Sequence, residues 1–248
     1  TWRVELWPAL GHALGVKLKV LGDDPVAPTT ELISIPQAKV PQYAFPRMSI
    51  GLEPTCRQPA FVKLEENREL LQGNPYGREG RSTRHISLDI SDTSLSYQAG
   101  DHLGVLPCNP DDLVNDYLRQ LEVDEEMANS VVTLVDNKTK KNVLPAKVTV
   151  RQGLKWYIDL AGVPKKSALR AFTHYCSDPV EKAQFQALLV VNPAAQEEFH
   201  RFIKRTRTIL GVLRYFKSCK IPLGHFMELM PHIAPRYFSI SSDQLKQP

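Results

Sequence analysis

The segment PRYFSISSDQ, residues 235–244, decides how this chain is expected to fold. Its large and small side chains alternate, which is typical of a β-strand, and we predict a strand over 236–242. Successive side chains of a strand point to opposite faces. One face is predicted to carry Arg236, Phe238 and Ile240, and the other Tyr237, Ser239 and Ser241.

The side chains of this strand suit a ligand that contains a diphosphate and a flat ring. The guanidinium of Arg236 can donate two parallel hydrogen bonds to phosphate oxygens. The ring of Phe238 can stack on a planar heterocycle, and the hydroxyl of Ser239 can hydrogen-bond the edge of that heterocycle. A buried strand with an ion-paired arginine is the alternative that the segment alone leaves open.

Further strands are predicted in the first half of the chain. From Phe61 onward the pattern is that of short strands, and RHISLDI, residues 84–90, alternates apolar and polar side chains. The segment QAGDHLGVLPC, residues 98–108, places a turn at Gly100 before another strand. The glycine-rich basic loop 73–82 lacks the spacing of a phosphate-binding motif, so we expect a solvated hairpin loop.

The periodicity changes from that of strands to that of helices at Asn109. Asn109 is expected to cap a helix that begins at Pro110, and the acidic residues that follow favour the positive end of its dipole. The period returns to that of a strand at Arg236, so we predict a helical domain inserted into a β domain. The other predicted helices cover 150–161, 165–176, 179–190, 194–216 and 222–233.

The predicted helix over 194–216 begins a strongly basic segment. Between His200 and Met227 there are several basic residues and no acidic ones. The opposite stripe, from Phe202 to Phe216, is apolar and is expected to pack into a core. The basic side chains suit a surface that faces phosphates or an acidic partner domain, or else an ordinary solvated face.

Composition and charge exclude several classes of protein. The net charge of +4 is small for a dedicated nucleic-acid binder, so we expect no nucleic-acid partner. No stretch approaches the ~20 apolar residues of a membrane span, and we expect no membrane contact from this segment. The four cysteines are far apart without zinc spacing, so we predict reduced thiols and no metal site.

Several segments together resemble the diflavin reductase family of the ferredoxin–NADP reductase superfamily. PRYFSISS is similar to the flavin motif Arg-x-Tyr-Ser-x-x-Ser, and residues 83–110, TRHISLDISDTSLSYQAGDHLGVLPCNP, are similar to the first strands of the flavin barrel. TWRVELWPAL, residues 1–10, resembles the final helix of the family's FMN domain. RTRTILGVL, residues 205–213, resembles the helix that precedes the motif strand.

The resemblance implies an α+β fold, in which an antiparallel FAD-binding β-barrel of the ferredoxin reductase type is interrupted by an inserted α-helical connecting domain. The barrel would be incomplete, because the family's later segments and its NADPH-binding domain are not found before Pro248. The 248-residue chain alone is therefore expected to lack stable FAD and activity. The implied divisions are 1–16 (terminal helix of a flavodoxin-like FMN domain), 17–60 (linker), 61–108 with 236–248 (barrel) and 109–235 (connecting domain).

The resemblance also implies roles for the residues of the motif strand. Arg236 would hold the FAD diphosphate, and Phe238 would stack on the isoalloxazine. Ser239 would be the catalytic residue, beside the flavin edge that accepts hydride, and Tyr237 would adjoin them in the cofactor site. The family has Tyr at the position of Phe238. The ring face is retained but the hydroxyl is lost, so FAD is expected to bind more weakly by about 0.5–1.5 kcal/mol.

Two arginines outside the motif are also implied to contact cofactors. Arg84 matches a position that contacts the NADPH phosphates, and Arg207 lies where the family has a further FAD-contacting arginine. His102, in the turn Gly-Asp-His, is expected to be structural.

The implied activity is that of an NADPH–haemoprotein reductase-type oxidoreductase. It would pass electrons from NADPH through FAD and FMN to a haem or other acceptor protein. Reductases of the nitric oxide synthase, methionine synthase reductase or iron–sulfur assembly type are alternatives, as is a non-catalytic docking module that has lost its flavin. The expected location is the cytoplasm, or the cytosolic face of the endoplasmic reticulum where the whole protein carries an N-terminal anchor.

Overall fold

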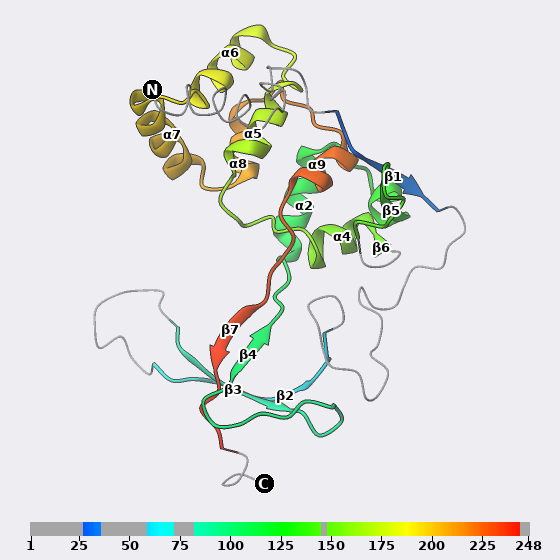
Figure 1. Cartoon of the computed structure of the whole chain (residues 1–248), viewed down its shortest axis with the longest axis vertical. Coiled ribbons are helices and arrows are strands. Elements are labelled where there is room, and N and C mark those ends of the chain that lie inside the picture. Colours follow the sequence, from blue (N-terminus) through cyan, green and yellow to red (C-terminus); the bar gives the residue numbers. More distant parts are fainter. Residues whose placement is uncertain (1–26, 36–58, 72–81, 145–147, 244–248) are drawn as a thin grey trace, which may run out of the picture.

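A computed structural model of the chain describes residues 27–35, 59–71, 82–144 and 148–243 (Figure 1). The helix predicted over 1–16 and nearly all of the glycine-rich loop lie outside these residues. The strands are β1 (Thr30–Ser34), β2 (Lys63–Glu69), β3 (Arg84–Asp89), β4 (His102–Val105), β5 (Val131–Asp136), β6 (Val148–Thr149) and β7 (Arg236–Ser239). The helices are α2 (Asp111–Gln120), α3 (Glu125–Asn129), α4 (Val150–Trp156), α5 (Lys166–Thr173), α6 (Pro179–Leu188), α7 (Pro193–Thr206), α8 (Ile209–Tyr215) and α9 (Leu223–Leu229).

Strands β4 and β7 form an antiparallel ribbon, although all the described helices lie between them in the sequence. The paired Cα positions run from His102 with Ser239 to Val105 with Arg236. The prediction that the motif strand returns to a strand before Asn109 is therefore confirmed. The strand itself is shorter than predicted, because β7 ends at Ser239.

Strands β2 and β3 form a second antiparallel ribbon, with a register shift between Leu64 and Glu66. These strands are the two arms of the hairpin that the sequence predicts. Two of their apolar side chains are largely exposed, Leu64 at 52% and Ile86 at 48%. The two ribbons are separate sheets among the described residues, so the chain is a mixed α and β protein with antiparallel sheets. Closure into a barrel stays a prediction.

The hydrophobic core lies within the helical region between β4 and β7. The rings of Phe185 and Phe216 stack with their centroids 4.3 Å apart. The buried hydroxyl of Tyr117 donates to the Leu160 carbonyl and accepts from the Leu210 amide, both at 3.0 Å, which joins α2 to the start of α8. The predicted apolar stripe of the basic segment belongs to this core; its buried members are Phe202, Ile209, Leu213 and Phe216.

Four of the predicted helices are confirmed as α4, α5, α6 and α9, and each ends earlier than predicted. In α4 the early end has a visible cause. Ile158 forms an isolated antiparallel bridge with His232, which takes the backbone out of the helix two residues after Trp156.

The single helix predicted over 194–216 is wrong, because the structure has two helices there, α7 and α8. The chain breaks at Arg207, whose φ of 64° is in the left-handed region. The side chain of Thr208 then caps α8 by accepting a hydrogen bond from the Gly211 amide at 3.3 Å. A Cβ at Gly211 would lie 2.1 Å from the Thr206 carbonyl oxygen, so the tight joint between the two helices requires glycine.

A small sheet lies within the helical region, and the sequence did not predict it. Its strand order is β1–β5–β6, with antiparallel neighbours. β5 has the sequence VVTLVD, whose β-branched residues favour a strand. β1 lies inside the range 17–60 that was expected to be linker, and it pairs with β5 from Thr30 with Asp136 to Ser34 with Val132. Part of the expected linker is therefore built into the helical body.

The expectation that Asn109 caps α2 is wrong. The N-cap position is Pro110, and it has no side-chain cap. Asn109 is 5% exposed, and its side-chain nitrogen donates to the carbonyls of Leu154 at 2.7 Å and Ile158 at 2.6 Å. The side-chain amide of Asn109 therefore donates to carbonyls at the end of α4, because these buried carbonyls need hydrogen-bond donors.

The end of α4 holds both chain segments that connect the helices to the β4–β7 ribbon. In the segment that enters the helical region, the backbone amide of Asn109 donates to the Lys155 carbonyl at 2.9 Å. On the returning side, the Asp159 amide donates to the Pro231 carbonyl, and the Ile233 amide donates to the Tyr157 carbonyl, both at 2.8 Å. We call this set of contacts the α4 clasp. It brings the two connections together where the ribbon leaves the helices (Figure 1).

Glu228 of α9 attaches β1 to the helical body. Its carboxylate accepts hydrogen bonds from the amide and hydroxyl of both Thr29 and Thr30, at 2.6–3.1 Å. Partial burial of Glu228 acts to raise its pKa, but the hydrogen bonds from the two threonines outweigh burial and hold the pKa below its ordinary value.

This attachment predicts a loss of stability at acidic pH. A carboxyl group with a lowered folded-state pKa stabilises the fold above its ordinary pKa of 4.5, and this contribution is lost as the pH falls through the folded-state pKa. Glu228→Gln removes the titration, so its free energy of unfolding in urea is expected to fall less than that of the wild type between pH 7 and acidic pH. The control is Glu126→Gln, on the exposed first turn of α3. Equal acid dependence of Glu228→Gln and the wild type would contradict the prediction.

Candidate functional site

One face of the β4–β7 ribbon carries Arg236 and Phe238. Residues paired across an antiparallel ribbon share a face. Arg236 therefore lies beside Val105, and Phe238 lies beside Leu103. Phe238 is 57% exposed and Val105 is 41% exposed. This face combines a cation with an open apolar and aromatic surface.

The opposite face carries Tyr237 and Ser239, as the alternation of the sequence predicts. The ring of Tyr237 lies over Gly104, where an added Cβ would be 3.2 Å from the ring. The hydroxyl of Ser239 is 3.3 Å from Nε2 of His102. The structure thus brings the four motif residues together on one strand but divides them between its two faces.

Arg236 is available to a ligand. All four residues of β7 are exposed, and within the described part of the chain no hydrogen bond or ion pair uses the Arg236 side chain. The alternative of a buried strand with an ion-paired arginine is therefore wrong for the described residues. A free guanidinium and an exposed ring on the same face fit a diphosphate and a flat heterocycle.

The C-terminal end of β7 is held by the turn that the sequence predicts at Gly100 and by two contacts that the sequence did not predict. Gly100 has a φ of 93°, which confirms the predicted turn. Beyond it, the Ile240 amide donates to the Asp101 carbonyl at 2.9 Å. The hydroxyls of Tyr97 and Ser242 are 2.7 Å apart. Such contacts join residues far apart in the sequence, so no local pattern could have indicated them.

Arg84 lies on the other ribbon, at the start of β3. Its Nη1 donates to Oδ1 of Asn67 at 3.0 Å, and its Nε is 3.9 Å from a carboxylate oxygen of Glu69. Hydrogen bonds to Glu69, from the Ser82 hydroxyl and then from the amides of Leu71 and Thr83, lower the Glu69 pKa to about 2. Arg84 is therefore held by the β2–β3 ribbon, and no hydrogen bond or ion pair of the described residues links it to β7.

Arg207 lies at the joint between α7 and α8, in the helical part of Figure 1, whereas β7 lies in the ribbon below that part. No hydrogen bond or ion pair among the described residues joins Arg207 to the motif strand. Its predicted contact with the cofactor therefore has no support from the geometry and stays a prediction.

The basic segment is partly neutralised by acidic residues from other elements. Arg214 forms an ion pair with Asp116 of α2 at 2.9 Å, and Lys220 forms one with Glu122. Four exposed cations of the segment have no ion pair with a described residue: Lys204, Arg205, Arg207 and Lys217.

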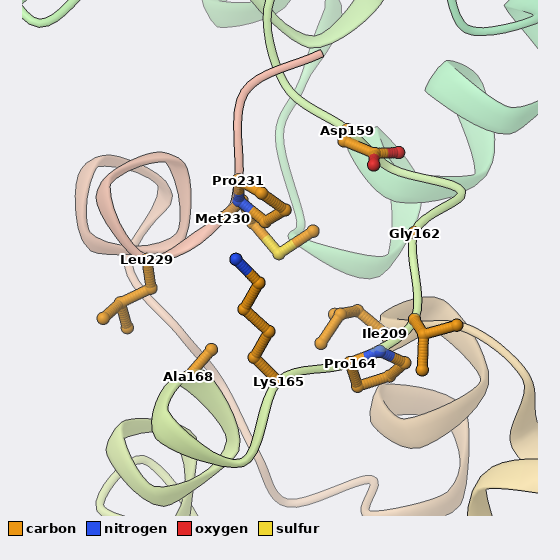
Figure 2. A pocket seen from close by; sticks show the side chains of 10 residues that line it. Asp159, Gly162, Pro164, Lys165, Ala168, Ile209, Leu229, Met230 and Pro231 are labelled. Atoms are coloured by element: carbon orange, nitrogen blue, oxygen red, sulfur yellow. The ribbon is translucent and has the colours of Figure 1, made fainter. Parts of the chain in front are cut away.

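A small pocket lies beside the returning connection at Pro231. It is lined by Asp159, residues 162–165, Ala168, Ile209 and residues 229–231. Figure 2 shows the side chain of Lys165 extending toward Met230 and Pro231. The pocket has a volume of about 10 Å³, which is room for about one water molecule, so the pocket is too small for a nucleotide cofactor.

The described residues provide neither a membrane-spanning helix nor a metal-binding cluster. None of the described helices has both the length and the apolar character needed to span a membrane. The described residues also contain no cluster of three or more His, Cys, Asp or Glu side chains that could hold a metal ion.

Comparison with protein families decides the assignment. A family model described as FAD binding domain matches residues 54–248. The chain belongs to the FAD binding domain family. The match includes both ribbons and every described helix, so the candidate strand β7 is part of an FAD binding domain.

Curated relatives of this FAD binding domain agree with the predicted resemblance to diflavin reductases. The chain is 28% identical over 257 residues to NADPH--cytochrome P450 reductase of Drosophila melanogaster. It is 30% identical over 256 residues to the protein of that name from Oryctolagus cuniculus, and 29% identical over 256 residues to the one from Homo sapiens. Each match covers 100% of this chain and 37% of the relative, so the chain spans little more than a third of the relatives' length.

Proposed function

We propose that this chain is the part of an NADPH-dependent diflavin reductase that holds the first half of the FAD site. The whole protein passes electrons from NADPH through FAD and FMN to a haem or other acceptor protein. The observation that carries the proposal is Arg236, which has no ion pair with a described residue, beside the exposed ring of Phe238 on a strand within an FAD binding domain.

Each residue of β7 has a separate role in binding FAD. Arg236 binds the diphosphate, because a guanidinium forms bidentate charge-assisted hydrogen bonds with phosphate oxygens. Phe238 supplies a flat surface for the flavin ring. Ser239 is the catalytic residue at the flavin edge, and its hydroxyl is oriented by His102 at 3.3 Å. Tyr237, on the same face of β7 as Ser239, supports the strand by packing over Gly104. FAD, when bound, supplies the change from two-electron to one-electron chemistry.

The other parts of the predicted arrangement belong to the same proposal. The ribbons from 61–108 and 236–248 are parts of an antiparallel FAD-binding barrel, and the inserted helical domain 109–235 sets the position of the FMN domain. Arg84 contacts NADPH phosphates, and Arg207 contacts FAD. NADPH oxidation is proposed to require a protein of the relatives' full length, of which this chain spans 37%. The protein acts in the cytoplasm or on the cytosolic face of the endoplasmic reticulum.

Two alternatives differ in how well the site supports them. Reductases of the nitric oxide synthase, methionine synthase reductase or iron–sulfur assembly type would use the same β7 residues, and the acceptor distinguishes them. A docking module that has lost its flavin would have no need for an exposed aromatic ring beside an arginine that no described residue pairs with. The site therefore favours a flavin-binding protein over a docking module.

Substitutions in β7 test this division of roles in a protein that carries this sequence and spans the full length of the relatives. Arg236→Ala is expected to weaken FAD binding roughly 10- to 100-fold, because hydrogen bonds to charged groups contribute about 1.5–3 kcal/mol. Phe238→Tyr is expected to tighten it by up to about tenfold. Ser239→Ala is expected to keep FAD while flavin reduction by NADPH slows about 100-fold. Flavin absorbance titration and stopped-flow reduction measure these effects.

Arg119→Ala is the matched control for the loss of an arginine, since Arg119 is exposed on α2 and paired with Asp116. Its FAD affinity should equal that of the wild type. The roles of anchor and edge would be reversed if Ser239→Ala lost FAD while Arg236→Ala bound it normally. Normal FAD binding in all the variants would remove β7 from the site.

Lys204 and Lys217, which form no ion pair with a described residue, are proposed to face the acidic surface of the FMN domain. The double variant Lys204→Glu and Lys217→Glu is expected to slow electron transfer from FAD to FMN at low salt. The effect should shrink as ionic strength rises, because the Debye length falls to about 10 Å at 0.1 M. Lys141→Glu, at an exposed position after the end of β5, is the control. An unchanged rate at low salt would indicate that the basic segment is an ordinary solvated face.

A further inference from the structure

Two buried cysteines face one another at a point where the helical body is joined by a short antiparallel bridge. Cys176 lies in the turn between α5 and α6, and Cys219 lies in the turn between α8 and α9. The Ser177 amide donates to the Ser218 carbonyl at 3.3 Å, and the Lys220 amide donates to the Tyr175 carbonyl at 3.1 Å. The hydrogen bonds thus flank the cysteine pair and do not join the two cysteines.

This arrangement is the non-hydrogen-bonded pair of an antiparallel ladder. In such a pair the Cα atoms are about 4.5 Å apart and the side chains are at their closest. Disulfides form when the Cα atoms are separated by about 4.4–6.8 Å. Cys176 and Cys219 are both free thiols, and their side chains are close enough to interact by a hydrogen bond. The backbone therefore places the two cysteines at a separation that a disulfide bond can span.

We propose that Cys176 and Cys219 are a site of reversible oxidative modification, at which a hydroperoxide converts the two thiols into a disulfide. In the first step, the Cys176 sulfur displaces the alcohol or water from the hydroperoxide, which is reduced, and becomes a sulfenic acid. In the second step, the Cys219 sulfur attacks the sulfenic sulfur and releases water. Two thiols are oxidised by two electrons, and a thiol reductant reverses the change. The inference does not depend on flavin binding.

The surroundings of the two thiols indicate the order of the steps. Cys176 is the more accessible residue, at 7% exposure against 3% for Cys219. The Cys219 thiol donates to the carbonyl of Phe172 at 3.2 Å. Burial raises the pKa of both thiols, so the reactive thiolates are scarce and the reaction is slow compared with that of an exposed thiol. Cys176 is therefore oxidised first, and Cys219 resolves it.

The disulfide would fasten the α5–α6 turn to the α8–α9 turn and close a loop that contains α6, α7 and α8. A cross-link of this kind stabilises a protein mainly by restricting the unfolded chain. The oxidised helical body should therefore melt at a higher temperature than the reduced one. The modification would stiffen the body whose α4 clasp holds the β4–β7 ribbon.

The test uses the whole chain with Cys56→Ser and Cys108→Ser, which leaves only the buried pair. The folded protein is treated with hydrogen peroxide, alkylated after unfolding, and digested without reductant for mass spectrometry. The expected product is a peptide pair joined through Cys176 and Cys219, with two hydrogens lost, neither thiol alkylated, and a raised Tm. Dithiothreitol should restore both thiols and the original Tm.

Adding Cys219→Ser gives the matched control for the order of oxidation. This variant should accumulate a sulfenic acid at Cys176, trapped by dimedone, and form no cross-link. The wild-type chain shows that the peroxide is active, because its exposed Cys108 must react. The proposal would be overturned if Cys108 were oxidised while Cys176 and Cys219 stayed alkylatable. It would equally be overturned if Cys176 passed to the sulfinic acid without a link to Cys219.

Discussion

The side-chain amide of Asn109 donates two hydrogen bonds to carbonyls at the buried end of α4, and the position of β7 depends on this contact. The segment that enters the helical body and the segment that leaves it are both fastened to the same turn, residues 154–159. Because both connections begin from one point, β4 and β7 can meet as neighbours although the helices separate them in the sequence. The α4 clasp thus allows β4 and β7 to pair, although the whole helical region separates them in the sequence.

The functional importance of the β4–β7 ribbon lies in the exposed side chains of β7. Buried positions are concentrated in the helical body, whereas every residue of β7 is exposed. Such exposure of a cation and two aromatic rings has little structural benefit. It suits a strand that is completed by a ligand and by further parts of an FAD binding domain. The fold therefore separates a buried helical core from an exposed β surface, on which we propose that FAD binds.

The sequence predicted the elements whose signals are local. Alternation identified β3 and β7, and helical periodicity identified α4, α5, α6 and α9. It failed where a long-range contact overrides a local preference. Asn109 is a residue type favoured at helix N-caps, but its side chain donates to a carbonyl of α4. β1 lies in the range expected to be linker and pairs with β5. In the site, the residues of one strand were predictable from the motif, whereas the contacts with Tyr97 and Asp101 depend on tertiary structure.

Amide hydrogen exchange in Asn109→Ala tests the α4 clasp most directly. The variant loses two hydrogen bonds at the end of α4, so the amides of Asp159 and Ile233 should exchange at least about tenfold faster than in the wild type. The Leu210 amide, which donates to the Tyr117 hydroxyl inside the core, should keep its protection. Unchanged exchange at Asp159 and Ile233 would contradict the account. So would an increase that matches the one at Leu210, since it would mean that Asn109 supports the whole fold equally.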